Sequence, residues 1–144
     1  MNNCCFHLAI PLHNLDLAKQ FYVDGLGFTL GRASKQALIL NFVGHQVVGH
    51  LIDKKLARPA GVYPHHFGLI FFAKKDWDIL IERAKTKQLS FYREPSVRFP
   101  GLFIEHHSFY LLDPTNNLLE FKHYTNQDAI LGTSELAMIG DSTS

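Results

Sequence analysis

The chain has 144 residues, a formal net charge of +1 and an apolar fraction of 47%, a composition typical of a single globular domain. Lysine and arginine are not clustered, so nucleic-acid binding is not expected, because contacts to phosphates need concentrated positive charge. No apolar stretch approaches the roughly 20 residues that a membrane-spanning helix requires, and we therefore expect no membrane partner.

The cysteines and histidines give the first indications of environment and chemistry. The only cysteines, Cys4 and Cys5, are adjacent, and because a disulfide between neighbours is strained we expect two reduced thiols. The first residues contain neither a basic segment nor a long apolar one, so no signal peptide is expected and the protein is predicted to be cytoplasmic. Nine histidines exceed ordinary usage, and histidine is the commonest metal ligand.

The first half of the chain begins with a predicted strand at residues 6–12. Its alternation places His7 and Ala9 on one face and bulky apolar residues on the other. A helix follows, with Asn14 as its N-cap and Gly25 as the left-handed residue that ends it. Three further strands are predicted, at 27–30, 37–43 and 46–52.

The second half repeats this pattern, and an internal repeat decides the fold. Residues 65–71 form a predicted strand in which His66 and Gly68 occupy the places of the first histidine and its small neighbour. A helix capped by Asp76 follows, with an apolar stripe at helical spacing. Three more strands are predicted, at 89–94, 102–112 and 118–124.

The repeat predicts an α+β fold made of two tandem βαβββ modules that form a curved mixed sheet, a half-barrel cleft around a metal site. The whole chain, residues 1–144, is expected to be a single domain. Its expected parts are module one at 5–53, a linker at 54–64, module two at 65–124 and a C-terminal tail at 125–144.

Superposing the two copies places candidate ligands at equivalent positions. In module one, His7 lies on the first strand and His50 on the last strand. In module two, His66 lies on the first strand and Glu120 on the last strand. A buried Glu120 also needs a cationic partner, because an isolated carboxylate in the interior is destabilising. If the two sheets curve toward each other, both pairs meet in one cleft. Any one of these residues alone would more often be a core or surface residue, and their coincidence in a repeat carries the prediction.

The ligand set determines which metals and reactions are expected. Imidazoles with one carboxylate suit Fe(II), Mn(II), Ni(II), Co(II) or Zn(II). Two histidines and a carboxylate leave coordination positions open, as in non-haem Fe(II) oxygenases, whereas a fourth protein ligand favours Lewis-acid chemistry. We expect His7, His66 and Glu120 to bind one ion. His50 is expected to stand beside it and contact substrate, with direct coordination as the alternative.

Three other residues are candidates for contact with substrate. Strand alternation places His106 and Tyr110 on one face, which supplies an acid–base imidazole and a phenol near the metal. An ordinary core aromatic with a satisfied hydroxyl is the alternative for Tyr110. Arg98, in a predicted loop at 95–101, is a candidate for binding an anionic substrate group; an exposed arginine without such a role is the alternative.

Four stretches of the sequence resemble the vicinal oxygen chelate superfamily, which includes glyoxalase I, extradiol dioxygenases, fosfomycin thiol transferases and bleomycin-binding proteins. They are His7 in Phe-His-Leu-Ala-Ile-Pro-Leu, residues 18–28, His66 in His-Phe-Gly-Leu-Ile, and Asp113-Pro114 through Glu120. The resemblance covers residues 5–124. It implies paired βαβββ modules, a divalent metal held by His7, His66 and Glu120, and a homodimer.

The resemblance leaves several activities open. Tyr110, ten residues before Glu120, matches the extradiol dioxygenase pattern, which Asn116 breaks, and His50 stands where glyoxalase I has a carboxylate or amide. We therefore expect a metal-dependent enzyme, with Fe(II) favoured over Ni, Co, Mn or Zn, that acts on a small molecule with vicinal oxygens as a dioxygenase. The alternatives are a redox-neutral glyoxalase-type isomerase or lyase, and a non-catalytic, antibiotic-sequestering binding protein.

Overall fold

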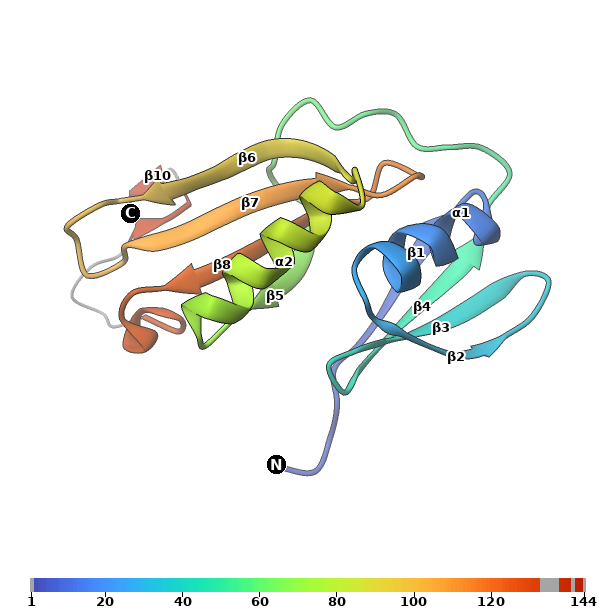
Figure 1. The fold of residues 1–144 in the computed structure, drawn as a ribbon, viewed down its shortest axis with the longest axis horizontal. Helices are drawn as coiled ribbons and strands as arrows, with labels where there is room; N and C mark the ends of the chain where they lie inside the picture. Colours follow the sequence, from blue (N-terminus) through green and yellow to red (C-terminus); the bar gives the residue numbers. More distant parts are fainter. Residues whose placement is uncertain (1, 133–137, 141, 144) are drawn as a thin grey trace.

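The computed structural model describes residues 2–132, 138–140 and 142–143. Two βαβββ modules follow one another along the chain, each built on a four-stranded mixed sheet, as the repeat predicted (Figure 1). The two sheets are separate and do not close into a barrel. Within the described residues, no helix is both long and apolar enough to cross a bilayer.

Module one has the strand order β1-β4-β3-β2, with β1 parallel to β4. Its elements are β1 (His7–Leu12), α1 (Leu15–Lys19), the π-helix η1 (Gln20–Gly25), β2 (Thr29–Ala33), β3 (Ala37–Phe42) and β4 (His45–Leu51). The predicted cap is confirmed, since Asn14 Oδ1 accepts a hydrogen bond from Leu17 N at 3.0 Å. The helical segment ends at Gly25, as predicted, as a π-helix. The left-handed conformation expected at Gly25 was wrong, because the residue with positive φ is Gly27, at 84°.

Module two has the equivalent order β5-β8-β7-β6, with β5 parallel to β8. Its elements are β5 (Phe67–Ile70), α2 (Lys74–Thr86), β6 (Ser90–Arg98), β7 (His106–Leu112) and β8 (Leu118–Tyr124), followed by η2 (Gln127–Ala129), β9 (Met138–Ile139) and β10 (Ser142–Thr143). The predicted cap at Asp76 was wrong, because α2 begins earlier, after Ala73. Asp76 instead lies in the first turn, where its charge favours the positive end of the helix dipole.

Strand β6 runs further than the sequence predicted. It passes through Pro95 and ends at Arg98, and its pairing with β7 shifts register between Arg93 and Ser96. A bulge of this kind accommodates a proline, which has no N–H to donate to the neighbouring strand. Arg98 therefore lies on a strand, and its expected position in a loop was wrong.

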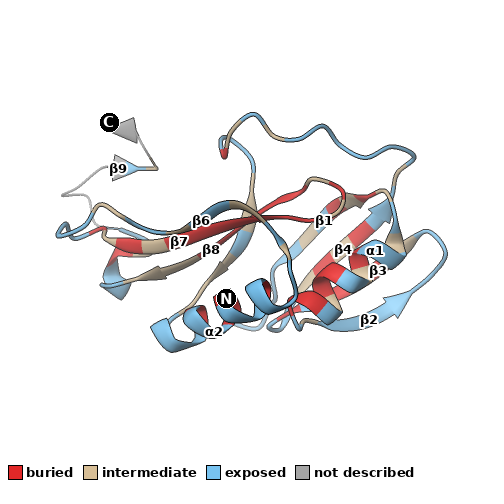
Figure 2. Cartoon of the chain, turned by 45° about the horizontal axis from the view of Figure 1, so that its top comes forward, coloured by how far each residue is buried: buried red, intermediate tan, exposed pale blue. Residues whose placement is uncertain are grey.

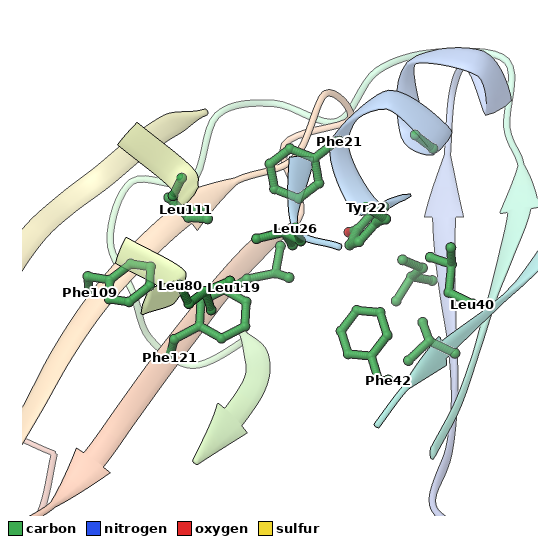
Figure 3. Packing of buried hydrophobic residues seen from close by; sticks show 14 of the residues in the cluster. Phe21, Tyr22, Leu26, Leu40, Phe42, Leu80, Phe109, Leu111, Leu119 and Phe121 are labelled. Carbon is green, nitrogen blue, oxygen red and sulfur yellow. The ribbon is translucent and has the colours of Figure 1, made fainter. Parts of the chain in front are cut away.

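One hydrophobic core joins the modules. Tyr22, Phe42 and other apolar side chains of module one pack beside Phe109 and Phe121 of module two (Figure 3). Buried residues concentrate along β7 and β8 and on the inner turns of the helices (Figure 2). A buried hydrogen bond also crosses between the modules, from the Tyr22 hydroxyl to Asp113 Oδ2 at 2.6 Å. Burial and the charge of Asp113 raise the pKa of Tyr22, so the phenol stays protonated and keeps donating.

Strand alternation separates the core face of each sheet from a functional face. In β1, Ile10 and Leu12 are buried in the core, while His7 and Ala9 are exposed on the opposite side, as predicted. Module two has the same division, since Leu119 and Phe121 belong to the core and Glu120, between them on β8, faces the opposite side. The candidate site is built on these non-core faces.

Candidate functional site

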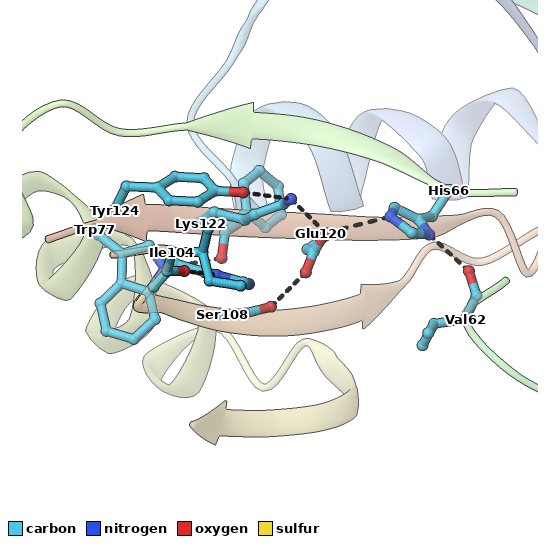
Figure 4. Close-up of polar contacts among 10 residues, drawn as sticks. Val62, His66, Trp77, Ile104, Ser108, Glu120, Lys122 and Tyr124 are labelled. Atoms are coloured by element: carbon cyan, nitrogen blue, oxygen red, sulfur yellow. Dashed lines mark hydrogen bonds and ion pairs between the residues drawn. The ribbon is translucent and has the colours of Figure 1, made fainter. Parts of the chain in front are cut away.

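His66 and Glu120 meet on the non-core face of module two (Figure 4). His66 precedes β5, and its Nε2 lies 3.2 Å from Glu120 Oε1. Its Nδ1 donates to the carbonyl oxygen of Val62 at 2.6 Å, which fixes the ring and directs Nε2 toward the carboxylate. Gly68 pairs with Glu120 in the β5–β8 ladder, and a Cβ there would collide with the Glu120 carbonyl. Glycine therefore lets β5 lie close to β8.

The electrostatic surroundings keep Glu120 ionised. The residue is only 6% exposed, and burial alone would raise its pKa. The hydrogen bond from His66, the charge of Lys122 at 3.5 Å and the hydrogen bond from Ser108 Oγ at 2.6 Å outweigh burial and hold the pKa of Glu120 at about 2. The hydrogen bond to Glu120 in turn raises the pKa of His66.

Tyr110 stands directly beside this pair. It is the partner of Glu120 in the β7–β8 ladder. Its ring lies edge-on to the His66 ring, with the ring centroids 5.3 Å apart. Burial, followed by its hydrogen bond to Glu120, raises the pKa of Tyr110 well above its ordinary value. The phenol is therefore a retained proton donor next to the carboxylate.

A cavity of about 660 Å³ opens over this face, a size that suits a small-molecule ligand. His66, Tyr110 and Glu120 form one part of its wall. Arg98, His106, Lys122 and Tyr124 also line it. The structure thus brings Arg98, His106 and Tyr110 into one cavity with two of the three predicted ligands.

His106 lies in the cavity but away from Glu120. It pairs with Tyr124 in the β7–β8 ladder, four residues beyond Glu120 along β8, which is about 13 Å at the usual rise of a strand. Its Nδ1 donates to the Ile104 carbonyl at 2.9 Å, and burial lowers its pKa. The imidazole is therefore neutral and fixed in place at the far end of the cavity.

His7 is not brought to this cavity within one chain. It lies exposed on β1 in the other module (Figure 1), and it does not line the cavity. Its Nδ1 is 2.7 Å from Gln46 Oε1. Among the residues that the structure describes, no group of three or more histidines, cysteines, aspartates and glutamates is placed to hold a metal. A single chain therefore assembles two of the three predicted ligands.

The expected equivalence of His50 and Glu120 was wrong. When the modules are aligned on their first-strand histidines, the ladder partner of Ala9 is Val48 and that of Gly68 is Glu120. Val48 thus occupies the place of Glu120, and His50 lies two residues further along β4. His50 is exposed and pairs with Pro11 on β1.

The turn before β4 accounts for part of the error. Val43 and Gly44 both have positive φ, at 52° and 90°, so they form the two-residue turn that favours a tight hairpin. Strand β4 consequently begins at His45, one residue earlier than predicted. The rest of the shift arose because the comparison counted positions from the strand starts, whereas the equivalent positions are set by the pairing with the first strand of each module. The face predicted for His50 is unaffected, since a shift of two preserves strand parity.

Lys122 and Tyr124 are polar residues of the cavity that sequence reasoning missed. Both follow Glu120 on β8 at intervals of two, so they share its face, and both line the cavity. Extending the alternation from Glu120 to the end of its strand would have found them.

The donor set of this face fits a divalent metal ion. An imidazole with one nitrogen anchored on a carbonyl and the other directed at a buried carboxylate is the usual arrangement of a metal-ligating histidine. Glu120 is ionised, as a ligand must be. His66 and Glu120 are the residues of this chain's cavity that would hold the ion.

Comparisons with known proteins agree with this fold. A sequence model of the Glyoxalase/Bleomycin resistance protein/Dioxygenase superfamily matches residues 5–121, while no curated protein matches the chain. Among solved structures, a glyoxalase/bleomycin resistance protein/dioxygenase from Alicyclobacillus acidocaldarius is 46% identical, with a TM-score of 0.83, over 89% of this chain and 96% of that one.

More distant structures share the fold alone. The fosfomycin resistance protein FosX from Listeria monocytogenes is 16% identical, with a TM-score of 0.70, over 90% of this chain and 100% of that one. A lactoylglutathione lyase from Agrobacterium tumefaciens is 18% identical, with a TM-score of 0.61, over 84% and 93% of the two chains. The match over residues 5–121 covers most of the sequence, and the chain belongs to the glyoxalase/bleomycin resistance protein/dioxygenase superfamily.

Proposed function

We propose that the protein is a metal-dependent enzyme acting on a small molecule with vicinal oxygens, and that two copies of the chain complete each active site. The observation that carries the proposal is the 3.2 Å approach of His66 Nε2 to Glu120 Oε1 in the wall of a cavity of about 660 Å³. When bound, a divalent ion supplies a Lewis acid for two neighbouring substrate oxygens.

His7 is the third ligand in this proposal, and a second copy supplies it. His7 resembles His66 in its surroundings, since each Nδ1 is anchored, one by Gln46 Oε1 and the other by the Val62 carbonyl. Anchoring of this kind leaves Nε2 for a metal. Because His7 is exposed and distant from the cavity of its own chain, we place the open face of module one over the module-two cavity of the partner subunit. The result is a homodimer with two equivalent sites.

The ladder register favours three protein ligands over four. Val48, at the place equivalent to Glu120, offers no donor atom. His50 lies four residues along β4 from Gln46, the ladder partner of His7. Two imidazoles and one carboxylate leave coordination positions open, an arrangement associated with non-haem Fe(II) oxygenases. This supports Fe(II) and a dioxygenase-type reaction, with His50 of the partner subunit contacting substrate.

The remaining residues have separate roles in the proposed site. Tyr110 retains its proton because burial raises its pKa, and it donates a hydrogen bond from its phenol oxygen toward substrate beside Glu120, where it would stabilise negative charge on a substrate oxygen. Arg98 and His106 line the other end of the cavity, where Arg98 binds an anionic substrate group. His106 is neutral because burial lowers its pKa. Its Nδ1 proton is donated to the Ile104 carbonyl, so its Nε2 accepts one hydrogen bond without adding charge.

A redox-neutral isomerase or lyase is the second candidate. The observation that favours it is Lys122, whose ammonium lies 3.5 Å from Glu120 Oε1 and would stabilise negative charge on a substrate oxygen. Elemental analysis of protein purified from its native host separates the candidates. Iron supports the dioxygenase, nickel, cobalt or zinc supports the redox-neutral enzyme, and the absence of a stoichiometric metal supports a binding protein.

The metal site itself is tested by removing one ligand at a time. Folded His66→Ala and Glu120→Ala variants should each lose the bound ion, while Lys75→Ala, an exposed change on α2, should keep it. Unchanged metal stoichiometry in either ligand variant would refute the proposed site.

A further inference from the structure

We propose that a second cavity, at the junction of the two modules, binds a phosphate group carried by a small molecule with an apolar part. The cavity has a volume of about 500 Å³, and the described residues that line it are all different from those that line the cavity over Glu120. Its wall is formed by α1 and η1 of module one, by the linker, and by the two turns of module two that precede β6 and β8. The inference goes beyond the proposed function and does not depend on it.

Three cations, from the linker and from α2, line this second cavity. They are Lys55 and Arg58 of the linker and Lys87 at the end of α2. The guanidinium carbon of Arg58 lies 4.9 Å from the centre of the Tyr92 ring, and the Tyr92 hydroxyl donates to the Pro59 carbonyl at 2.9 Å. This cation–π contact holds Arg58 in place and leaves its N–H groups for an acceptor in the cavity.

None of these three cations has a carboxylate partner among the described residues. No ion pair in that part of the chain includes Lys55, Arg58 or Lys87. Their charged groups are therefore available to an anion from solution, whose oxygens would accept charge-assisted hydrogen bonds from them.

Asp113 is the one carboxylate among the described residues that line the second cavity, and its oxygens are already occupied. Oδ1 accepts from the backbone N–H groups of Thr115 and Asn117, both at 2.8 Å. Oδ2 accepts from the Tyr22 hydroxyl at 2.6 Å and from Asn117 Nδ2 at 2.8 Å. A carboxylate has about four acceptor positions, so Asp113, which is 2% exposed, has none left for the three cations.

The wall of the second cavity also offers uncharged donors and an apolar surface. The Ser90 hydroxyl and the side-chain amides of Gln20 and Gln88 line it, and these side chains form no hydrogen bond with any other described residue. Leu17, which is 39% exposed, and Leu89 line it as well. Donors for the oxygens of a ligand thus lie beside a surface for an apolar group.

A phosphate monoester matches this combination of groups. It carries a charge of about −1.5 to −2 at pH 7 and has three terminal oxygens that accept strong hydrogen bonds. A guanidinium group binds two such oxygens in its plane, and an ammonium group binds them as a point charge. A carboxylate, with one charge and two oxygens, would use fewer of the three cations. The apolar part of the molecule would lie on Leu17 and Leu89.

Binding of small probes to the full chain tests this inference. Phenyl phosphate, inorganic phosphate and phenol are titrated in the presence of a chelator, and the NMR chemical shifts of the backbone amides are followed. We expect phenyl phosphate to shift the amides of residues 87–90 and to bind more weakly as the salt concentration rises. Phenol, which lacks the phosphate, should bind at least about 10-fold more weakly. Tighter binding of phenyl phosphate than of inorganic phosphate supports an organic phosphate as the ligand, and equal affinity would contradict the apolar part of the proposal.

One double variant and two controls locate the phosphate. Lys55→Met combined with Lys87→Met should weaken the binding of phenyl phosphate by about 10-fold, because two exposed charges are lost while their aliphatic stems remain. Lys35→Met combined with Lys75→Met removes the same charge from exposed positions outside both cavities and should leave binding unchanged. Lys122→Met removes a cation from the cavity over Glu120 and should also leave it unchanged.

Equal affinity of wild type and the Lys55→Met, Lys87→Met double variant for phenyl phosphate would overturn the inference. So would a loss in Lys122→Met as large as that in the double variant, because it would place the phosphate in the cavity over Glu120. These outcomes are independent of the metal, which the chelator removes. Failure of the proposed function would appear instead as unchanged metal content in the His66→Ala and Glu120→Ala variants.

Discussion

His66 and Glu120 form an ion pair at 3.2 Å between the start of β5 and the middle of β8. The pair joins two strands that are distant in sequence and parallel in space, and it lies on the face that the core does not use. It gives the site a fixed acceptor–donor geometry before any ligand arrives, because Val62 holds the imidazole and Ser108 holds the carboxylate.

The stability of the metal-free protein should depend on pH through this pair. The pKa of His66 is raised from 6.5, so its contribution is complete below that value and is lost as the pH rises through the raised pKa. The pKa of Glu120 is lowered from 4.5 to about 2, so its contribution is complete above 4.5 and is lost as the pH falls toward 2. Both contributions are present between pH 4.5 and 6.5.

Thermal unfolding of wild type and His66→Gln in chelator measures this effect. We expect wild type to be more stable by about 1.5–3 kcal/mol in that window, the range of a hydrogen bond to a charged group, and the difference to shrink above neutral pH. A stability difference that is constant from pH 5 to 9 would show that the pair does not ionise as described.

Gly68 should be intolerant of substitution. A Cβ on Gly68 would meet the backbone carbonyl of Glu120, and backbone atoms cannot yield as a flexible side chain can. Gly68→Ala should therefore destabilise the protein by about 2 kcal/mol or more by forcing β5 away from β8. Gly61→Ala is the matched control, since nothing lies within 4 Å of a Cβ there. Chemical denaturation that finds the two variants equally stable would contradict this packing.

His50 and His7 should differ in their effect on metal affinity. In the proposed site His7 is a ligand and His50 a substrate contact. His7→Ala should therefore reduce metal affinity by far more than the roughly 10–100-fold typical of residues that hydrogen-bond to metal ligands. His50→Ala should fall within or below that range. Equal losses in the two variants, measured by competition with a chelating dye, would make His50 a ligand and would favour Lewis-acid chemistry.

The sequence predicted most of the fold because the pattern of module one is repeated in module two. Alternation placed His7 and His66 on non-core faces, and the cap at Asn14 follows from its side chain alone. The errors concern strand bounds, at places where a bulge or a tight turn lengthens a strand beyond its predicted end or start. The bulge at Pro95 extended β6 to include Arg98, and the turn at Val43 moved the start of β4.

The site was less predictable than the fold. Periodicity assigns residues to a face, yet it does not say whether two faces belong to one cavity. His66 and Glu120 share a sheet, so a strand ladder brings them together, whereas His7 belongs to the other sheet. The core joins the two modules through their helix-covered faces, which directs the non-core faces away from one another within a single chain.

Mixed dimers test the two-copy active site most directly. His7→Ala and His66→Ala chains, each with a different affinity tag, are co-expressed and the heterodimer is isolated through both tags. One cavity of this heterodimer combines intact His66 and Glu120 from the first chain with intact His7 from the second, while the other cavity lacks both histidines. We predict one tightly bound metal ion per heterodimer, two per tagged wild-type dimer, and none in either variant homodimer. A heterodimer that binds no metal at wild-type affinity would contradict the account, because it would mean that each site draws all its ligands from one chain.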